Sequence, residues 1–271
     1  MDVDAYLKRI GYEGSRQPTG KTLRQLHRAH LFTVPFENLD IPLGHRIVIS
    51  RPAFYDKVVR RRRGGFCYEL NGLFGWLLEQ LGFSVSLLSS RVFDGAQPGP
   101  EFDHLVLLIE LEERWIADVG FGNLFLEPLR LDTEEADMQQ GSLYRFIKSN
   151  TGKVLQRRQT SDWEPQYFVS LIPHRLEDFS DMCHYQQTSP DSNFTRKAVC
   201  SLATPKGRIT LSNNRLIVTI GEQREERLVE DEAEYRALMR THFGITLGEE
   251  VQVDKLMHPI RLADDAQSME K

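Results

Sequence analysis

The chain has 271 residues, 40% of them hydrophobic and 27% charged, which is ordinary for a water-soluble globular protein large enough to bury a substantial core. Its formal net charge of -5 gives no reason to expect nucleic acid or an anionic membrane as the main partner. No apolar run reaches membrane-spanning length, and the first ten residues are unlike a secretory signal, so we expect one folded body in the cytoplasm.

Three cysteines, Cys67, Cys183 and Cys200, form an odd number at wide spacings. This suits neither a disulfide framework nor a C-x-x-C zinc site, and it predicts free thiols. His27 and His30 could face the same way on a helix, but no acidic or thiol residue accompanies them at a suitable spacing. We therefore predict no metal site.

Short helices are predicted over residues 4–10 and 22–30, where leucine or isoleucine recurs at helical spacing. The next segment, 34–40, is predicted to be irregular because prolines at positions 35 and 42 make a continuous helix improbable. Ser50 as N-cap and Pro52 in the first turn then predict a helix that ends near residue 62.

The end of that helix is basic, with Lys57 and four consecutive arginines at positions 60–63. We favour a solvated face whose positive charge complements the helix C-terminus. The alternative is that some of these side chains meet phosphate or a buried carboxylate.

Cys67 lies at the start of a predicted helix, because apolar residues follow it at helical spacing as far as Leu81 and Gly82 supplies a stop. Gly64 and Gly65 allow a tight bend just before it. First-turn N–H groups lack intrahelical partners, so they stabilise a thiolate and face an incoming oxyanion. A free helical cysteine is by default a small buried hydrophobe, but the glycines and the first-turn position favour a nucleophile here.

A strand over residues 82–91 precedes two buried strands, 104–109 and 115–119, which predict a hairpin. If Glu110 pairs with Arg114 around a three-residue loop, His104 and Asp118 become diagonal neighbours on one face of the sheet. A two-residue loop would instead place them on opposite faces.

Thiol chemistry needs a thiolate, a general base, and a carboxylate or amide that orients the base. Cys67, His104 and Asp118 supply these groups in chain order. His104 alone could be a structural histidine at the start of a strand. Asp118 lies in an apolar run, so its carboxylate must have a partner or carry a heavy desolvation cost.

The remainder of the chain predicts further strands with polar loops, one helix that ends at Gly244, and a frayed tail after Leu262. The predicted strands are 144–148, 153–158, 166–171, 198–203, 208–211 and 215–220, and the helix is 231–243.

At the nucleophile the chain resembles the arylamine N-acetyltransferases. Residues 63–71, Arg-Gly-Gly-Phe-Cys-Tyr-Glu-Leu-Asn, match the family's R-G-G-x-C-x-E-x-N signature at every defined position. Residues 34–39 resemble its V-P-F-E-N-L segment, and residues 103–104 with 117–122 resemble its histidine strand and D-V-G-F-G segment. The likeness extends more loosely through 192–194 and 200–202, so that it covers most of the chain.

The resemblance implies an α+β fold with an N-terminal helical bundle at 1–85 carrying the nucleophile, a central β-barrel at 86–190 carrying the histidine and aspartate, and a C-terminal α/β lid at 191–271. The triad would be arranged as in papain-like cysteine proteases. Cys67 would accept an acetyl group from acetyl-CoA, His104 would activate Cys67, and Asp118 would orient His104.

The implied reaction is ping-pong: coenzyme A leaves, and an arylamine, arylhydrazine or arylhydroxylamine then takes the acetyl group from Cys67. Phe36, Phe121 and Phe194 lie on segments that resemble family pocket segments, so they are candidates to bind the aromatic acceptor, with core packing as the alternative. Ser212 resembles a position that contacts coenzyme A in relatives, although an ordinary turn residue at a strand end would look the same.

Glu37 and Arg63 are predicted to form an ion pair that holds the 34–40 segment against the nucleophile helix. A different enzyme, a papain-like thiol hydrolase or amidase, would use the same triad, because water can also attack an acyl-cysteine. A binding protein without catalysis would carry an unreactive Cys67.

Overall fold

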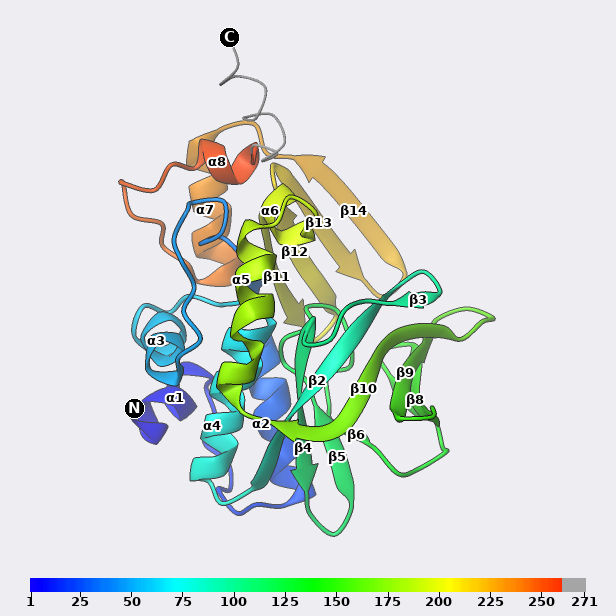
Figure 1. Cartoon of the computed structure of the whole chain (residues 1–271). Helices are drawn as coiled ribbons and strands as arrows, with labels where there is room; N and C mark the ends of the chain where they lie inside the picture. Colours follow the sequence, from blue (N-terminus) through cyan, green and yellow to red (C-terminus); the bar gives the residue numbers. More distant parts are fainter. Residues whose placement is uncertain (260–271) are drawn as a thin grey trace.

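The computed structural model describes residues 1–259, which form helices and two antiparallel sheets (Figure 1). The predicted α+β class is confirmed, with helices at the N-terminus, a barrel-like sheet in the middle and a helix-backed sheet at the C-terminus. The domain boundaries near residues 85 and 190 stay predictions. The predicted frayed tail lies outside the described residues.

The N-terminal helices follow the predicted pattern within a few residues. Asp2 and Thr19 cap the first two, since their side chains accept hydrogen bonds from the N–H groups of Ala5 and Thr22. The third passes into a π-helical turn, which precedes the helix that starts at Cys67. The bounds are α1 (Val3–Arg9), α2 (Gly20–Thr33), α3 (Arg51–Tyr55), the π-helical η1 (Asp56–Arg60) and α4 (Cys67–Gln80).

The larger sheet has the strand order β6-β5-β4-β2-β10-β9-β8-β7, with β3 paired to β2, and it curls into a nearly closed barrel (Figure 1). Its strands are β2 (Ser84–Asp94), β3 (Gln97–Pro98), β4 (His104–Glu110), β5 (Arg114–Ala117), β6 (Leu129–Arg130), β7 (Asp137–Gln139), β8 (Ser142–Lys148), β9 (Gly152–Arg158) and β10 (Glu164–His174).

Strand β4 explains why its sequence is apolar without alternation. Leu105 and Leu107 belong to the core that α4 helps to form, whereas Val106 and Leu108 belong to the core inside the barrel. Both faces of the strand are therefore buried, and the helical region and the barrel share this strand as a common wall. His104 is the first residue of the strand, at the edge of both cores.

The smaller sheet has the order β1-β11-β12-β13-β14, so a short segment near the N-terminus pairs with the C-terminal region. Cys200 and Leu211 pack on one face of this sheet in a core with Tyr235 and Met239 of the last long helix. The elements are β1 (Phe36–Glu37), β11 (Val199–Thr204), β12 (Gly207–Ser212), β13 (Arg215–Ile220), β14 (Gln223–Leu228), α7 (Glu232–Phe243) and α8 (Asp254–Met257).

Three helical elements between the barrel and the smaller sheet were not expected from the sequence: η2 (Leu176–Phe179), α5 (Ser180–Thr188) and α6 (Asn193–Arg196). Phe179 and Cys183 are buried in the same core cluster as Leu70 of α4. The chain thus returns from the barrel to the helical region before it enters the smaller sheet. No helix among the described residues is long and apolar enough to cross a membrane.

Candidate active site

His104 and Asp118 meet inside the protein, where His104 Nε2 lies 2.8 Å from Asp118 Oδ2 and both side chains are buried. The predicted register is confirmed, because Glu110 pairs with Arg114 and residues 111–113 form the three-residue loop. With Nε2 committed to the carboxylate, the Nδ1 atom of His104 is the ring nitrogen left for a second partner.

Asp118 is held in its ionised form. Burial would raise the pKa of its carboxyl group, but His104, a hydrogen bond from Asn71 and the N–H of Gly120 outweigh burial and lower it. Asn71 Nδ2 lies 2.8 Å from Asp118 Oδ1, and the Gly120 N–H donates to the same oxygen over 2.9 Å. The buried carboxylate is therefore fully hydrogen-bonded and can orient an imidazole.

Asn71 joins α4 to strand β4 and to the segment that follows β5. Its Nδ2 atom also donates to the carbonyl oxygen of Leu105 over 2.6 Å, and its Oδ1 atom accepts from the Val119 N–H over 2.8 Å. The signature contained this residue, but sequence reasoning gave it no role. Asn71 lies one helical turn after Cys67, at position i+4 on the same face of the helix. This spacing was the sequence signal that could have indicated a role for Asn71 beside Cys67.

His27 supports Asp118 through its main chain, a role that the sequence did not reveal. Its Nε2 accepts the main-chain N–H of Asp118 over 3.1 Å, and its Nδ1 donates to the carbonyl oxygen of Leu126 over 2.8 Å. Burial lowers the pKa of His27 to about 4, so the ring stays neutral and keeps this tautomer. Within residues 1–259 no group of three or more metal-ligating side chains could hold a metal ion.

Cys67 is the first residue of α4 and is 3% exposed. A Cβ atom placed on Gly120 would lie 2.8 Å from the Cα of Cys67, so the segment after Asp118 packs directly against Cys67. Burial raises the pKa of the thiol well above its ordinary value, Asp103 acts in the same direction, and a backbone hydrogen bond from Leu105 opposes both. Ionisation of Cys67 therefore depends on a nearby positive charge.

The two glycines before Cys67 are required for close packing rather than for an unusual backbone angle. A Cβ atom on Gly64 would lie 2.0 Å from the carbonyl oxygen of Pro35, and one on Gly65 would lie 2.8 Å from the Glu69 side chain. The Glu37 N–H donates to the Gly65 carbonyl oxygen over 2.9 Å, so the two segments touch main chain to main chain. The segment at 34–40 thus positions the start of α4.

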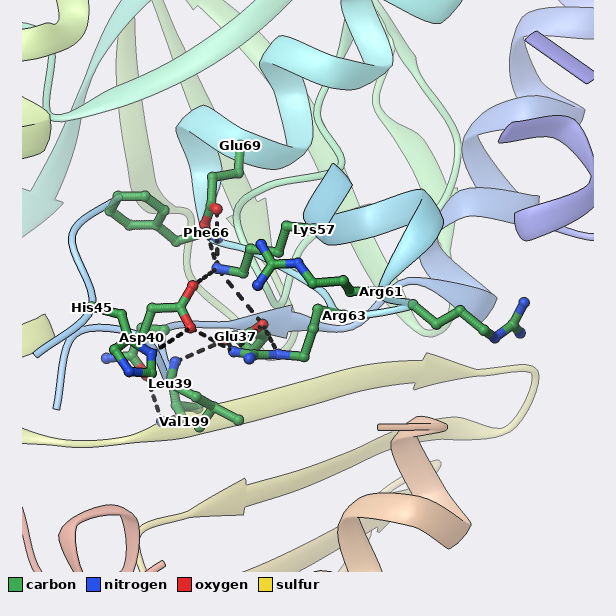
Figure 2. A network of polar contacts seen from close by, with 12 residues as sticks. Glu37, Leu39, Asp40, His45, Lys57, Arg61, Arg63, Phe66, Glu69 and Val199 are labelled. Atoms are coloured by element: carbon green, nitrogen blue, oxygen red, sulfur yellow. Dashed lines mark hydrogen bonds and ion pairs between the residues drawn. The ribbon is translucent and has the colours of Figure 1, made fainter. Parts of the chain in front are cut away.

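A buried network of five charged side chains lies behind this contact: Glu37, Asp40, Lys57, Arg63 and Glu69 (Figure 2). Arg63 donates two hydrogen bonds to Glu37, from Nε to Oε1 over 2.9 Å and from Nη2 to Oε2 over 3.1 Å. These contacts confirm the predicted ion pair. Lys57 Nζ lies 2.7 Å from Asp40 Oδ2 and 3.0 Å from Glu69 Oε1. Glu69 in turn accepts a hydrogen bond over 3.1 Å from the N–H of Phe66, the residue directly before Cys67.

The favoured interpretation of the basic run is wrong for two of its members. Lys57 and Arg63 point into the protein because three carboxylates there need partners, whereas Arg60 and Arg61 are exposed and face Asp56 at the surface. The pattern along one helix could not distinguish the two inward-pointing side chains from the two exposed ones, because the carboxylates that pair with them come from other segments of the chain.

The network also shifts the acidities of its members. Burial would raise the pKa of Asp40, but Lys57 and Arg63 lower it to about 2. Burial raises the pKa of Glu69 to about 7, because Lys57 opposes burial only in part and Glu37 and Asp40 add repulsion. The carboxyl group of Glu69 therefore gains or loses its proton near neutral pH.

The three candidate pocket phenylalanines are half-buried, and a series of contacts connects them to one another and to His104. The Phe121 ring lies edge-on to the His104 ring at 5.3 Å between centroids, and Phe36 and Phe194 lie 6.2 Å apart. A Cβ atom on Gly122 would lie 3.3 Å from the Phe36 ring. The Phe36 ring therefore packs against the residue that follows Phe121 in the chain. Their role in acceptor binding stays a prediction.

Ser212, the candidate for coenzyme contact, ends β12 opposite Val199 and Arg215. Both partners are in neighbouring strands of the smaller sheet. Its role stays a prediction.

Comparison with known proteins identifies the family of this chain. A sequence model described as N-acetyltransferase matches residues 20–252. An arylamine N-acetyltransferase from Mycolicibacterium smegmatis is 34% identical over 258 residues, which are 92% of this chain and 94% of the relative. The chain therefore belongs to the arylamine N-acetyltransferase family and is an acyltransferase.

Solved structures of the family have the same fold. An arylamine N-acetyltransferase from Mycobacterium marinum superposes with a TM-score of 0.88 at 32% identity, covering 96% of this chain and 100% of the other. The structure of the M. marinum enzyme in complex with CoA superposes with a TM-score of 0.86 at 32% identity, covering 94% of this chain and 97% of the other.

Proposed function

We propose that this protein transfers an acetyl group from acetyl-CoA to arylamines and arylhydrazines through an acetyl-cysteine at Cys67. The observation that carries the proposal is the 2.8 Å contact between His104 and Asp118 in a chain of this family. The segment that follows Asp118 packs against Cys67 at the start of α4. The CoA complex of the M. marinum enzyme supports the choice of donor.

In the first half-reaction, His104 takes the proton of Cys67 on Nδ1, and the thiolate attacks the thioester carbonyl. The first-turn N–H groups of α4 have no intrahelical partners and stabilise the oxyanion. When the tetrahedral intermediate collapses, the C–S bond to coenzyme A breaks and the imidazolium of His104 returns its proton to the departing thiolate.

In the second half-reaction, the aromatic acceptor binds beside Phe36, Phe121 and Phe194. Its nitrogen attacks the acyl carbon while His104 removes the amine proton, and the bond to Cys67 breaks. The hydroxyl oxygen of an arylhydroxylamine can attack in the same position, which would give O-acetylation. Asp118 keeps its negative charge throughout and stabilises the imidazolium.

The intact mass of the protein after mixing with acetyl-CoA tests this proposal. We expect one added acetyl group, absent in Cys67→Ala, that disappears when an arylamine is added and reappears on the amine. The control is His184→Ala, because His184 is exposed. Cys183→Ala is unsuitable as a control, because Cys183 is buried in the core.

The same triad could instead serve a thiol hydrolase, so the fate of the acyl group separates the two functions. Release of free acetate at the same rate with and without acceptor, or cleavage of a peptide or amide without an acetyl adduct, would reject the transferase proposal in favour of hydrolysis. An unmodified Cys67 in a folded protein would reject both.

A further inference from the structure

Phe194 is held in place by both polar groups of its main chain. Its N–H donates to the Ser192 hydroxyl oxygen over 3.1 Å, and its carbonyl oxygen accepts a hydrogen bond from Asn38 Nδ2 over 3.0 Å. The Phe194 ring lies edge-on to the Phe66 ring, with 5.7 Å between the two centroids. Phe66 is fully buried and directly precedes Cys67. The main chain of Phe194 therefore fixes how this candidate pocket ring lies relative to the start of α4.

Contacts outside α6 must hold Phe194, because α6 has only four residues and a helix this short is not stable alone. Ser192, the N-cap of α6, is 3% exposed. Its hydroxyl oxygen lies 2.6 Å from Oε1 and 2.9 Å from the carbonyl oxygen of Gln186. The single hydroxyl proton is donated to Gln186 in either case, which leaves the lone pairs of the oxygen to accept the Phe194 N–H.

Gln186, on α5, connects Ser192 to the residue before His104. Gln186 is 7% exposed, and its Nε2 donates to Asp103 Oδ1 over 2.7 Å. A carboxylate accepts hydrogen bonds and donates none, so the nitrogen of the amide must face Asp103 and its oxygen must face Ser192. The charge of Asp103 thus sets the direction of each hydrogen bond in the chain as far as the N–H of Phe194. Hydrogen bonds aligned in this way strengthen one another.

Asp103 is a fixed end of this chain of hydrogen bonds. The Tyr68 hydroxyl lies 2.9 Å from the carbonyl oxygen of Phe102 and 3.2 Å from that of Asp103. Phe102 has a φ of 61°, in the left-handed region that a bulky residue rarely adopts, and its N–H donates to the Ser89 hydroxyl over 2.8 Å. The segment before His104 is therefore held firmly, so that loss of the Gln186 contacts should displace α6 rather than His104.

We propose that Gln186 is a positioning residue for the aromatic acceptor, because it connects Phe194 to the segment that carries His104. This inference rests on the proposed function, in which Phe194 contacts the acceptor. An acceptor bound against Phe194 must place its nitrogen between the acetyl group on Cys67 and the imidazole of His104. Without Gln186 the Phe194 ring is free to move relative to both groups, so an aromatic acceptor would be oriented less well.

Gln186→Leu tests the proposal in the second half-reaction, since leucine is of similar size but makes no hydrogen bond. Cys67 is first acetylated with acetyl-CoA, and loss of the acetyl group is then timed with aniline, which has a ring, and with hydrazine, which has none. We expect the second-order rate constant for aniline to fall about tenfold, the effect typical of losing a hydrogen bond to a charged group. Acetylation by acetyl-CoA and the reaction with hydrazine should keep their wild-type rates. An unchanged aniline-to-hydrazine ratio would overturn the proposal.

Gln187→Leu is the matched control, because this neighbour on α5 uses its amide for contacts that do not lead to Phe194. Its Oε1 accepts the Ile47 N–H over 2.7 Å, and its Nε2 lies 3.1 Å from the carbonyl oxygen of Ile47 and 3.0 Å from that of Cys183. We expect a lower melting temperature and the wild-type aniline-to-hydrazine ratio. A change of this ratio as large as in Gln186→Leu would indicate general loosening of α5 and reject the proposal.

Two substitutions of Asp103 separate its hydrogen bond from its charge. Asp103 helps to raise the pKa of the Cys67 thiol, so Asp103→Asn and Asp103→Ala both change the surroundings of Cys67 in the same way. Only asparagine keeps an oxygen that can accept the hydrogen bond from Gln186 Nε2. We expect the wild-type aniline-to-hydrazine ratio in Asp103→Asn and the ratio of Gln186→Leu in Asp103→Ala. Equal ratios in the two variants would contradict the chain of hydrogen bonds.

Hydrogen exchange of the Phe194 N–H, followed by NMR, separates this inference from the proposed function because it requires no activity. We expect faster exchange in Gln186→Leu than in the wild type and no change in Gln187→Leu. Faster exchange in a protein that transfers no acetyl group would retain the connection between Gln186 and Phe194 and reject the activity. Acetyl transfer with unchanged exchange would keep the proposed function and reject Gln186 as a positioning residue.

The folding of each variant is checked by its thermal unfolding. If Gln186→Leu does not fold, Ser192→Ala decides the outcome, because it removes the next hydroxyl of the same chain of hydrogen bonds. The same fall in the aniline-to-hydrazine ratio is expected, and a wild-type ratio in a folded Ser192→Ala protein would overturn the proposal.

Discussion

His27 holds Asp118 by its main chain: the imidazole Nε2 accepts the aspartate N–H over 3.1 Å, while Nδ1 is fixed by the carbonyl oxygen of Leu126 over 2.8 Å. Asp118, the carboxylate proposed to orient His104, is therefore positioned through contacts with Asn71 at its side chain and with His27 at its backbone. Neither residue needs to touch substrate for its loss to matter.

We expect His27→Ala to reduce both stability and acetylation. The change leaves the buried N–H of Asp118 unpaired, which costs about 1–3 kcal/mol of the free energy of unfolding. Misplacement of the carboxylate should also slow acetylation of Cys67 at saturating acetyl-CoA. Urea unfolding and single-turnover mass measurements check the two effects, with exposed His184→Ala as control. Wild-type values for both quantities would show that His27 positions nothing.

Glu37→Gln should destabilise the protein more than it alters the choice of acceptor. The change leaves Arg63 and Lys57 with one fewer carboxylate inside the protein, and breaking a buried ion pair typically costs about 3–5 kcal/mol. The surface pair of Arg28 and Glu127 offers a control, since Glu127→Gln should cost at most about 1 kcal/mol. An altered acceptor profile without a loss of stability would contradict the structural role of Glu37.

Glu69 should make stability depend on pH between its ordinary pKa of 4.5 and its folded value of about 7. A carboxyl group whose pKa is raised by folding takes up a proton on folding, so its stabilising contribution is complete below pH 4.5 and is lost as the pH rises through about 7. We expect the free energy of unfolding to fall less steeply over this interval in Glu69→Gln than in the wild type.

Urea unfolding at several pH values measures this slope. Glu79→Gln, on the same helix but paired with Arg51 near the surface, is the control and should leave the slope unchanged. Identical slopes in the wild type and Glu69→Gln would mean that Glu69 does not take up the proton.

Gly64→Ala should prevent the loop before Cys67 from packing against the segment at 34–40. The added Cβ atom would lie 2.0 Å from the Pro35 carbonyl oxygen, so the backbone of one segment must move. We expect a marked fall in the melting temperature together with loss of Cys67 acetylation. At Gly20 the nearest atom to an added Cβ is a Trp115 ring carbon at 3.6 Å, so Gly20→Ala should be tolerated. Equal melting temperatures for the two variants would rule out this explanation.

The sequence predicted the elements around the site because their patterns are local. Helical spacing after Cys67 and the apolar hairpin that carries His104 and Asp118 each depend on a few adjacent residues. A three-residue loop between the two strands was the stated condition for His104 and Asp118 to meet, and the structure has this loop. The Glu37 and Arg63 pair was also predictable once the family resemblance had brought their segments together.

Other features depend on contacts between residues that are far apart in the sequence, which no local pattern predicts. Strand β14 reads Gln-Arg-Glu-Glu-Arg-Leu and is exposed throughout, so it lacks the alternation that indicates a strand and forms only by pairing with β13. Helix α5 is largely polar, and burial of Cys183 against the N-terminal core fixes it in place. The role of His27 requires knowing that residue 118 lies 91 positions away in sequence but next to it in space.

The pH dependence of Cys67 alkylation tests the central claim, that His104 supplies the charge which ionises a buried thiol. Because burial raises the pKa of Cys67, an isolated thiol at this position should react with iodoacetamide only at alkaline pH. We predict rapid alkylation of the wild type at mildly acidic pH and none there in His104→Gln, measured by intact mass. Identical pH profiles in the two proteins would contradict the account.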